Sequence, residues 1–123
     1  MTKDEFRKRT FQLGIRCIRL AESLPKSTSS AVVAKQLIRA ATSVGANYRA
    51  AIRGRSRADF ISRMGIVEEE CDEVLYWIEV LLELGLIPIA RTAELQREAN
   101  EILAIVVSSI KTARKGTQPK TSQ

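Results

Sequence analysis

Apolar residues recur along most of the chain at spacings of three, four and seven, which is the spacing of one face of an α-helix. The pattern predicts four helices and no strand. We expect the helices over residues 4–24, over residues 30–53, between Ser56 and Gly85, and over residues 92–115. Because the connections are short, consecutive helices should be antiparallel neighbours. The sequence therefore predicts an all-α fold, an antiparallel up-down-up-down four-helix bundle of residues 1–116, followed by a disordered polar tail over residues 117–123.

Capping residues indicate where these helices begin and end. The expected N-caps are Asp4, Ser29 or Ser30, Ser56 and Thr92. The third helix has the clearest start, since Ser56 and Asp59 have the spacing of a capping box. Gly85 should end that helix, and Pro88 should keep the next one from starting at once.

The first two helices carry more apolar or small surface than one core face requires. In the first helix, Phe11, Ile15 and Ile18 widen the apolar stripe, so this helix can be covered on two sides. Gly45 lies in the middle of the second helix, where glycine costs about 1 kcal/mol relative to alanine, so another backbone should come close there. We expect a homo-oligomer, with these candidates for subunit or helix-packing contacts: Ala41, Gly45, Asn47, Tyr48 and Trp77.

The composition is that of an ordinary globular domain. It is 45% hydrophobic and 28% charged, with a mean hydropathy of −0.10 and no apolar run long enough for a membrane span. The N-terminal segment has charges of both signs and no secretion signal, so we expect a cytoplasmic protein with no membrane partner. Cys17 and Cys71 lie in apolar stripes and should be buried, reduced thiols.

Charge is segregated along the chain. The net charge of +6 is the balance of +10 over residues 1–57, −8 over residues 58–101 and +4 over residues 102–123. Such segregation is typical of a basic face for nucleic acid, of self-association through unlike surfaces, or of helices that neutralise one another.

The candidate nucleic-acid contacts are two clusters of basic residues. They are Arg49, Arg53, Arg55, Arg57 and Arg63 around the end of the second helix, and Arg7, Lys8 and Arg9 near the N-terminus. Contacts to phosphate need such clusters and supply affinity without sequence choice. The competing interpretation is that these arginines form salt bridges with the acidic third helix, within or between subunits.

The sequence offers little catalytic chemistry. It has no histidine, no phosphate-binding glycine loop and no C-x-x-C motif, so we expect no enzyme and no cofactor. In the acidic run at residues 68–73, Glu69 and Glu73 are one turn apart, but no other helix supplies facing carboxylates, so we expect no metal. This run should be a solvated face or a set of partners for arginines of the second helix.

Tyr76 and Trp77 are adjacent and should point to different sides, one toward the core and one toward the surface or a subunit contact.

A set of residues in the second and third helices matches a known pattern. The set is Gln36, the run from Arg39 to Arg49, Ser56-Arg57, Asp59-Phe60, Glu70, Glu73 and Tyr76-Trp77. With these residues the chain resembles the bacterial 23S rRNA intervening-sequence protein family. It departs from the family pattern at Ala50 and Glu69, and we expect Glu69 to pair with an arginine instead.

The resemblance implies an antiparallel four-helix bundle, often assembled as a homopentamer, and it brings no catalytic residue. A related branch of the family engages nucleic acid and a reverse transcriptase through a basic pentamer. Our first hypothesis is a non-enzymatic oligomeric module that binds RNA or DNA non-specifically through a basic surface. The alternative is a protein-protein interaction scaffold with internally neutralised charges and no affinity for nucleic acid.

Overall fold

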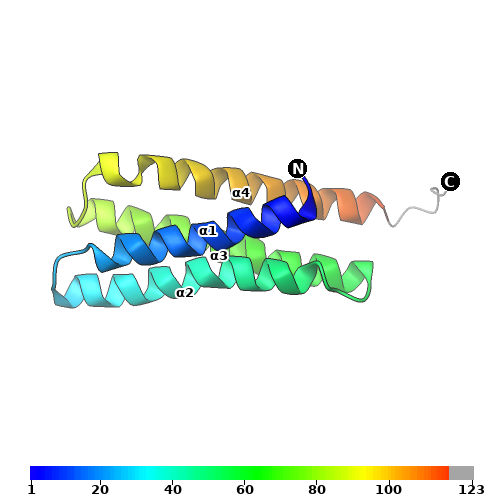
Figure 1. The fold of residues 1–123 in the computed structure, drawn as a ribbon, viewed down its shortest axis with the longest axis horizontal. Coiled ribbons are helices and arrows are strands. Elements are labelled where there is room, and N and C mark those ends of the chain that lie inside the picture. The colour runs from blue at the N-terminus through cyan, green and yellow to red at the C-terminus, as the bar shows by residue number, and fades with distance from the viewer. Residues whose placement is uncertain (117–123) are drawn as a thin grey trace.

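The computed structural model describes residues 1–116, so the predicted tail at 117–123 lies outside the described residues. The described chain forms four helices: α1 (Lys3–Glu22), α2 (Thr28–Ala51), α3 (Arg57–Glu83) and α4 (Ile89–Lys115). The chain reverses direction at each connection, so the start of α1, the α2–α3 turn and the end of α4 lie toward the same end of the molecule (Figure 1). The prediction of an all-α four-helix fold is confirmed.

One apolar core runs along the bundle. Each helix contributes fully buried side chains, such as Leu13 of α1, Leu37 of α2, Met64 of α3 and Ile102 of α4. α2 packs against both α1 and α3, whereas α1 and α4 touch each other much less. In the part of the chain that the structure describes, no helix is long and apolar enough to cross a membrane.

The α1–α2 contact depends on glycine. A Cβ atom on Gly45 would lie 3.2 Å from the backbone oxygen of Thr10 and 3.4 Å from Cα of Phe11. A Cβ atom on Gly14 would lie 3.4 Å from the oxygen of Ala41, which is fully buried. The predicted close backbone approach at Gly45 is therefore confirmed. Because it lies within the chain, these small residues do not by themselves indicate a subunit contact.

Two predicted N-caps are wrong by a few residues. Thr2, not Asp4, caps α1: the Glu5 amide donates to Thr2 Oγ1 at 3.0 Å, and the Thr2 amide donates to Glu5 Oε1 at 2.7 Å. This reciprocal pair satisfies two backbone donors, and Asp4 cannot form one because Arg7, three residues on, is a cation. α2 begins after Ser27, whose hydroxyl accepts from the Ser30 amide at 3.1 Å.

The ends of α3 agree with prediction, but the start of α4 does not. Ser56 caps α3 by accepting from the Asp59 amide at 3.0 Å, and Gly85 follows α3 with a positive φ of 67°. α4 begins directly after Pro88, which takes the N-cap position in extended conformation. Proline is tolerated there because the cap residue needs no amide donor. Thr92 is instead buried inside the first turn and donates to the Ile89 oxygen at 3.1 Å.

We expect opposite effects from replacing two mid-helix glycines. Gly65→Ala meets nothing within 4 Å and should raise the free energy of unfolding by about 0.5–1 kcal/mol through helix propensity. Gly45→Ala gains the same propensity but must push the α1 backbone away, so it should lower the free energy of unfolding. Urea denaturation of both variants beside the parent measures the difference. A Gly45→Ala variant as stable as Gly65→Ala would contradict the close-approach argument.

Candidate nucleic-acid interface

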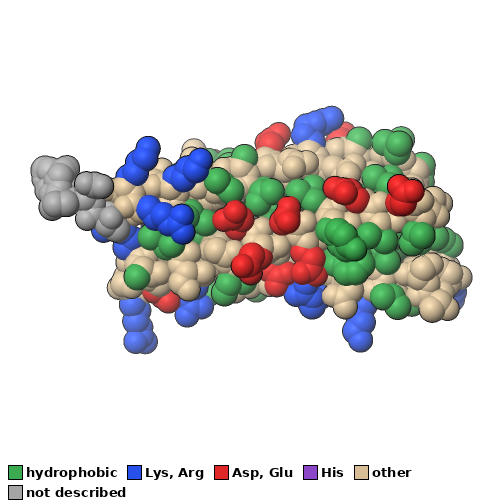
Figure 2. Space-filling view, turned by 180° about the vertical axis from the view of Figure 1, so that it is seen from behind, with side chains coloured by type: hydrophobic (Ala, Val, Ile, Leu, Met, Phe, Trp, Pro, Cys, Tyr) green, Lys and Arg blue, Asp and Glu red, His purple; other side chains and the backbone are tan. Residues whose placement is uncertain are grey.

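Basic side chains gather at the end of the bundle where the α2–α3 turn lies. Figure 2 shows Lys and Arg side chains gathered at one end of the bundle and Asp and Glu side chains over the middle of the same face. By the bounds of the helices, this basic end consists of Lys3, Arg7, Lys8, Arg49, Arg53, Arg55, Arg57, Arg63, Lys111, Arg114 and Lys115. Helix order thus brings residues far apart in sequence to one surface.

The α2–α3 turn holds three arginines around one hollow. Arg53, Arg55 and Arg63 line a space of about 580 Å³ together with Ala50 and Asp59. Arg63 is held by Asp59, with Nε–Oδ distances of 3.3 and 3.2 Å. Among the described residues, no carboxylate lies within 4.0 Å of Arg53 or Arg55. Two guanidinium groups here are therefore available for an external anion.

Gly54 lies close to its neighbours in this turn. A Cβ atom on Gly54 would lie 2.8 Å from Asp59 Oδ2 and 3.0 Å from the Ala51 oxygen. The absence of a side chain at Gly54 therefore lets the carboxylate that holds Arg63 come close to the turn.

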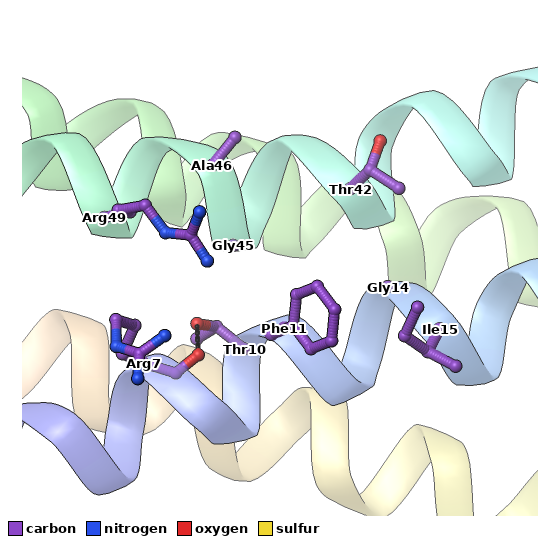
Figure 3. Close-up of a pocket in the computed structure, with 9 residues that line it drawn as sticks. All are labelled: Arg7, Thr10, Phe11, Gly14, Ile15, Thr42, Gly45, Ala46 and Arg49. Atoms are coloured by element: carbon purple, nitrogen blue, oxygen red, sulfur yellow. Dashed lines mark hydrogen bonds between the residues drawn. The ribbon is translucent and has the colours of Figure 1, made fainter.

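A second hollow, of about 210 Å³, lies between α1 and α2 (Figure 3). Arg7 of α1 and Arg49 of α2 line it from opposite helices. Arg7 is bonded to Asp4, at 3.2 Å through Nε and 2.8 Å through the Nη2 nitrogen. Arg49 has no carboxylate within 4.0 Å in the described part of the chain. The hollow thus has two cations at its rim.

Arg57 lies between the α2–α3 turn and the surface of α4. It lines a third hollow, of about 630 Å³, with Lys3, Phe60 and one face of α4. A Cβ atom on Gly116 would lie 3.6 Å from Arg57 Nε, so Arg57 lies beside the end of α4. Sequence reasoning missed the contribution of Lys111 and Lys115 to this end. The signal was present in the +4 charge of residues 102–123 and in the antiparallel order.

Arg9, in contrast, forms ion pairs between two helices of the bundle. Its guanidinium donates to the two carboxylate oxygens of Glu98 at 2.8 and 2.6 Å and to Glu101 at 3.0 Å. This pairing ties α1 to α4, two helices that otherwise touch little. The hydrogen bonds from Arg9 lower the pKa of Glu98 below its usual 4.5. Lys8, the other candidate next to Arg9, is exposed and lies 3.4 Å from Asp4.

The acidic run of α3 pairs with α2 at a different place. Arg39 donates to both oxygens of Glu70, at 3.0 and 3.2 Å, and also to Glu73. The Trp77 indole donates to Glu73 at 3.0 Å, and this bond, followed by the one from Arg39, lowers the pKa of Glu73. The expectation that α3 carboxylates serve arginines of the second helix is confirmed for Arg39. Within residues 1–116 of one chain, Glu69 forms no ion pair, so its expected arginine partner is not found inside the subunit.

The remaining packing candidates, Asn47, Tyr48 and Trp77, form contacts inside one subunit. Asn47 donates to the Ser43 hydroxyl at 2.8 Å, which in turn donates to Glu70 at 3.2 Å, extending the Arg39 network along α2. Tyr48 is buried edge-on against Phe6, with ring centroids 4.8 Å apart. Trp77 packs against the core, as predicted for one member of its pair. The other member, Tyr76, is 56% exposed.

The cysteines and acids offer no reactive centre in the described residues. Cys17 and Cys71 are buried free thiols, as predicted, and burial raises the pKa of each to about 12. Thiols with so high a pKa are poor nucleophiles at neutral pH. Residues 1–116 contain no group of three or more His, Cys, Asp or Glu side chains placed to hold a metal ion.

Two comparisons with known proteins give matches. A family model described as 23S rRNA-intervening sequence protein matches residues 2–108. A crystal structure from Bacteroides thetaiotaomicron, described as a protein of unknown function from the S23 ribosomal protein family, is 31% identical with a TM-score of 0.83. That match covers 90% of this chain and 99% of the other. Among curated proteins, none matches.

The different environments of Arg9 and Arg53 predict different effects on stability. Arg9→Gln leaves Glu98 without its partner and should lower the free energy of unfolding by about 1 kcal/mol near neutral pH. Because the folded-state pKa of Glu98 is lowered, the stabilisation is present above about pH 4.5 and is lost as the pH falls through the folded value. Acid should therefore destabilise the parent more than Arg9→Gln.

Arg53→Gln is the matched control, since its guanidinium is exposed and has no carboxylate partner among residues 1–116. Its free energy of unfolding should stay within about 0.5 kcal/mol of the parent. Chemical denaturation at several pH values measures both variants. Equal stability and equal acid sensitivity in all three proteins would show that the Arg9 pair contributes nothing.

Proposed function

We propose that this chain, which belongs to the 23S rRNA-intervening sequence protein family, is a non-enzymatic helical module that binds RNA or DNA non-specifically through its basic end. The proposal rests on one observation. Arg49, Arg53 and Arg55 have no carboxylate within 4.0 Å in the described chain, although α3 offers a run of acids. Carboxylates instead hold Arg9, through α4, and Arg39, through α3.

Unpaired arginines suit phosphate for geometric and energetic reasons. The guanidinium fork can donate two parallel hydrogen bonds to phosphate oxygens, and it stays charged at any working pH. Each neutralised phosphate releases condensed counterion, which is the main source of non-specific affinity. Contacts of this kind position a strand without reading its bases.

The proposal includes a homo-oligomer, a pentamer by resemblance to the family. Its support is the exposed apolar surface of α3, where Tyr76 is 56% and Ile66 40% exposed. A closed ring would present several copies of the basic end to one strand, and linked sites bind far more tightly than a single one. We place this activity in the cytoplasm, where the thiols of Cys17 and Cys71 would stay reduced.

The second candidate function is a protein-interaction scaffold. The ion pairs of Arg9 with Glu98 and Glu101, and of Arg39 with Glu70 and Glu73, favour it, because they show how readily this chain neutralises its own charge. If subunits of an oligomer also neutralised the basic end, no affinity for nucleic acid would remain.

A salt titration with an arginine variant separates the two functions. The variant carries Arg49→Ala, Arg53→Ala, Arg55→Ala and Arg57→Ala. The parent should bind a labelled RNA and a labelled DNA at about 50 mM salt and lose most of that affinity by about 200 mM. The variant should reduce the slope of log K against log salt by about 3 to 4, close to 0.9 for each lost phosphate contact. Fluorescence anisotropy measures both quantities.

The matched control removes the same charge elsewhere. The four exposed cations to replace by alanine are Arg19, Lys26, Lys35 and Arg97, which lie outside the basic end. This control should keep most of the parent's affinity. Equal losses in both quadruple variants would mean that net charge, not the basic end, drives binding. No binding by the parent at the lowest salt would favour the scaffold.

A further inference from the structure

The hollow between α1 and α2 combines an exposed aromatic ring with two cations. Phe11 of α1 is 49% exposed although its neighbours Thr10 and Leu13 are fully buried. Its ring lies beside the space of about 210 Å³ that Arg7 and Arg49 also line. Figure 3 shows both arginines on the same side of the ring, one from each helix. The ring, the space and the charges therefore form one local site.

Small residues keep this ring uncovered. The α2 side of the hollow is lined by Thr42, Gly45 and Ala46, and Gly14 lines it from α1. Gly45 is required by the approach of the α1 backbone, because a Cβ atom there would lie 3.2 Å from the Thr10 oxygen. A larger side chain at position 45 would push against the α1 backbone, so the wild-type glycine leaves Phe11 uncovered from this position. The packing constraint of the fold thus leaves an aromatic surface open between two helices.

The size and charge of the hollow restrict what it can hold. Its volume is below the roughly 300–1,000 Å³ of pockets that enclose a small-molecule ligand, so it suits one ring of a larger ligand. Arg49 has no carboxylate partner among residues 1–116, and Arg7 is held in place by Asp4. A ligand with a flat ring and a nearby anionic group matches this arrangement, because the ring can stack on Phe11 while the anion binds the arginines. In a nucleic-acid strand, a base and its phosphate have that relation.

We propose that the α1–α2 groove binds an unpaired base of an RNA or DNA strand, stacked on Phe11, while Arg49 and Arg7 bind the adjoining phosphate. This inference rests on the proposed function and narrows it to single strands. In a duplex, each base is paired and stacked on its neighbours, so its face is not offered to an aromatic side chain. Single-strand binding proteins use this combination of a basic surface and stacking aromatics.

The first test compares a short single-stranded oligonucleotide with the duplex of the same sequence. Phe11→Ala should weaken binding of the single strand about tenfold and leave duplex binding unchanged. The salt slope should stay the same, because no phosphate contact is lost. Phe11→Trp should keep single-strand affinity, whereas Phe11→Leu, which keeps the apolar bulk without the flat ring, should lose it. Val32→Ala is the matched control, because it shortens an exposed apolar side chain of α2 outside the groove, and it should have no effect.

A direct reading of stacking comes from a strand that carries 2-aminopurine, whose fluorescence falls when it stacks on an aromatic ring. Quenching should occur with the parent and be lost with Phe11→Ala. Circular dichroism checks that each variant is folded. If Phe11→Ala does not fold, Phe11→Leu takes its place in the binding and fluorescence measurements.

Four outcomes would overturn the inference. Equal losses for single strand and duplex, or no change in 2-aminopurine fluorescence, would leave the arginines as a plain phosphate surface. In that case the quadruple arginine variant can still support the proposed function. A fall in the mass of the assembly with Phe11→Ala, measured by light scattering, would make the groove a contact with a second copy. Absence of binding to any nucleic acid would remove both proposals together.

Discussion

The close approach of the α1 and α2 backbones at Gly45 is the constraint on which the rest of this structure depends. A Cβ atom on Gly45 would lie only 3.2 Å from the Thr10 oxygen, so the backbones of the two helices are in close contact there. That contact places the small residues of α2 against α1, while Arg39 of α2 bonds to Glu70 of α3. It also brings Arg49 beside Arg7 and leaves the ring of Phe11 open to solvent. Stability and candidate binding surface therefore share one geometric cause.

Ion pairing then sorts the many arginines of this chain into two groups. Arg9 and Arg39 each meet two carboxylates across a helix-helix contact, where a partly shielded pair of fixed geometry can contribute to stability. Arg53 and Arg55 lie in a turn before the acidic run of α3, and in the described chain no carboxylate lies within 4.0 Å of either guanidinium. A cation that the fold leaves unneutralised is free to gain that partner from a ligand.

The predictions from sequence fail where neighbouring residues compete for one role. Asp4 and Thr2 can both cap a helix, and the choice depends on whether the residue three positions on can return the hydrogen bond, as Glu5 does. Caps differ by about 1 kcal/mol or less, which pattern alone does not resolve. The prediction of Thr92 as the N-cap assumes that Pro88 keeps α4 from starting until several residues later. Pro88 instead occupies the N-cap position itself, so α4 starts at Ile89. These errors move helix ends and leave the arrangement of the helices unchanged.

The sequence by itself determined the four helices, their order and their buried faces. Apolar periodicity is a local property, and a stripe of apolar residues must be covered wherever the helix lies. It also identified Gly45 as a close approach, because an unfavourable glycine needs a reason. Only the tertiary structure decided which arginines are free and which aromatic is exposed. Those properties depend on which side chains from distant segments lie within a few ångströms, and that distance is set by helix rotation and offset, which the pattern of one helix does not contain.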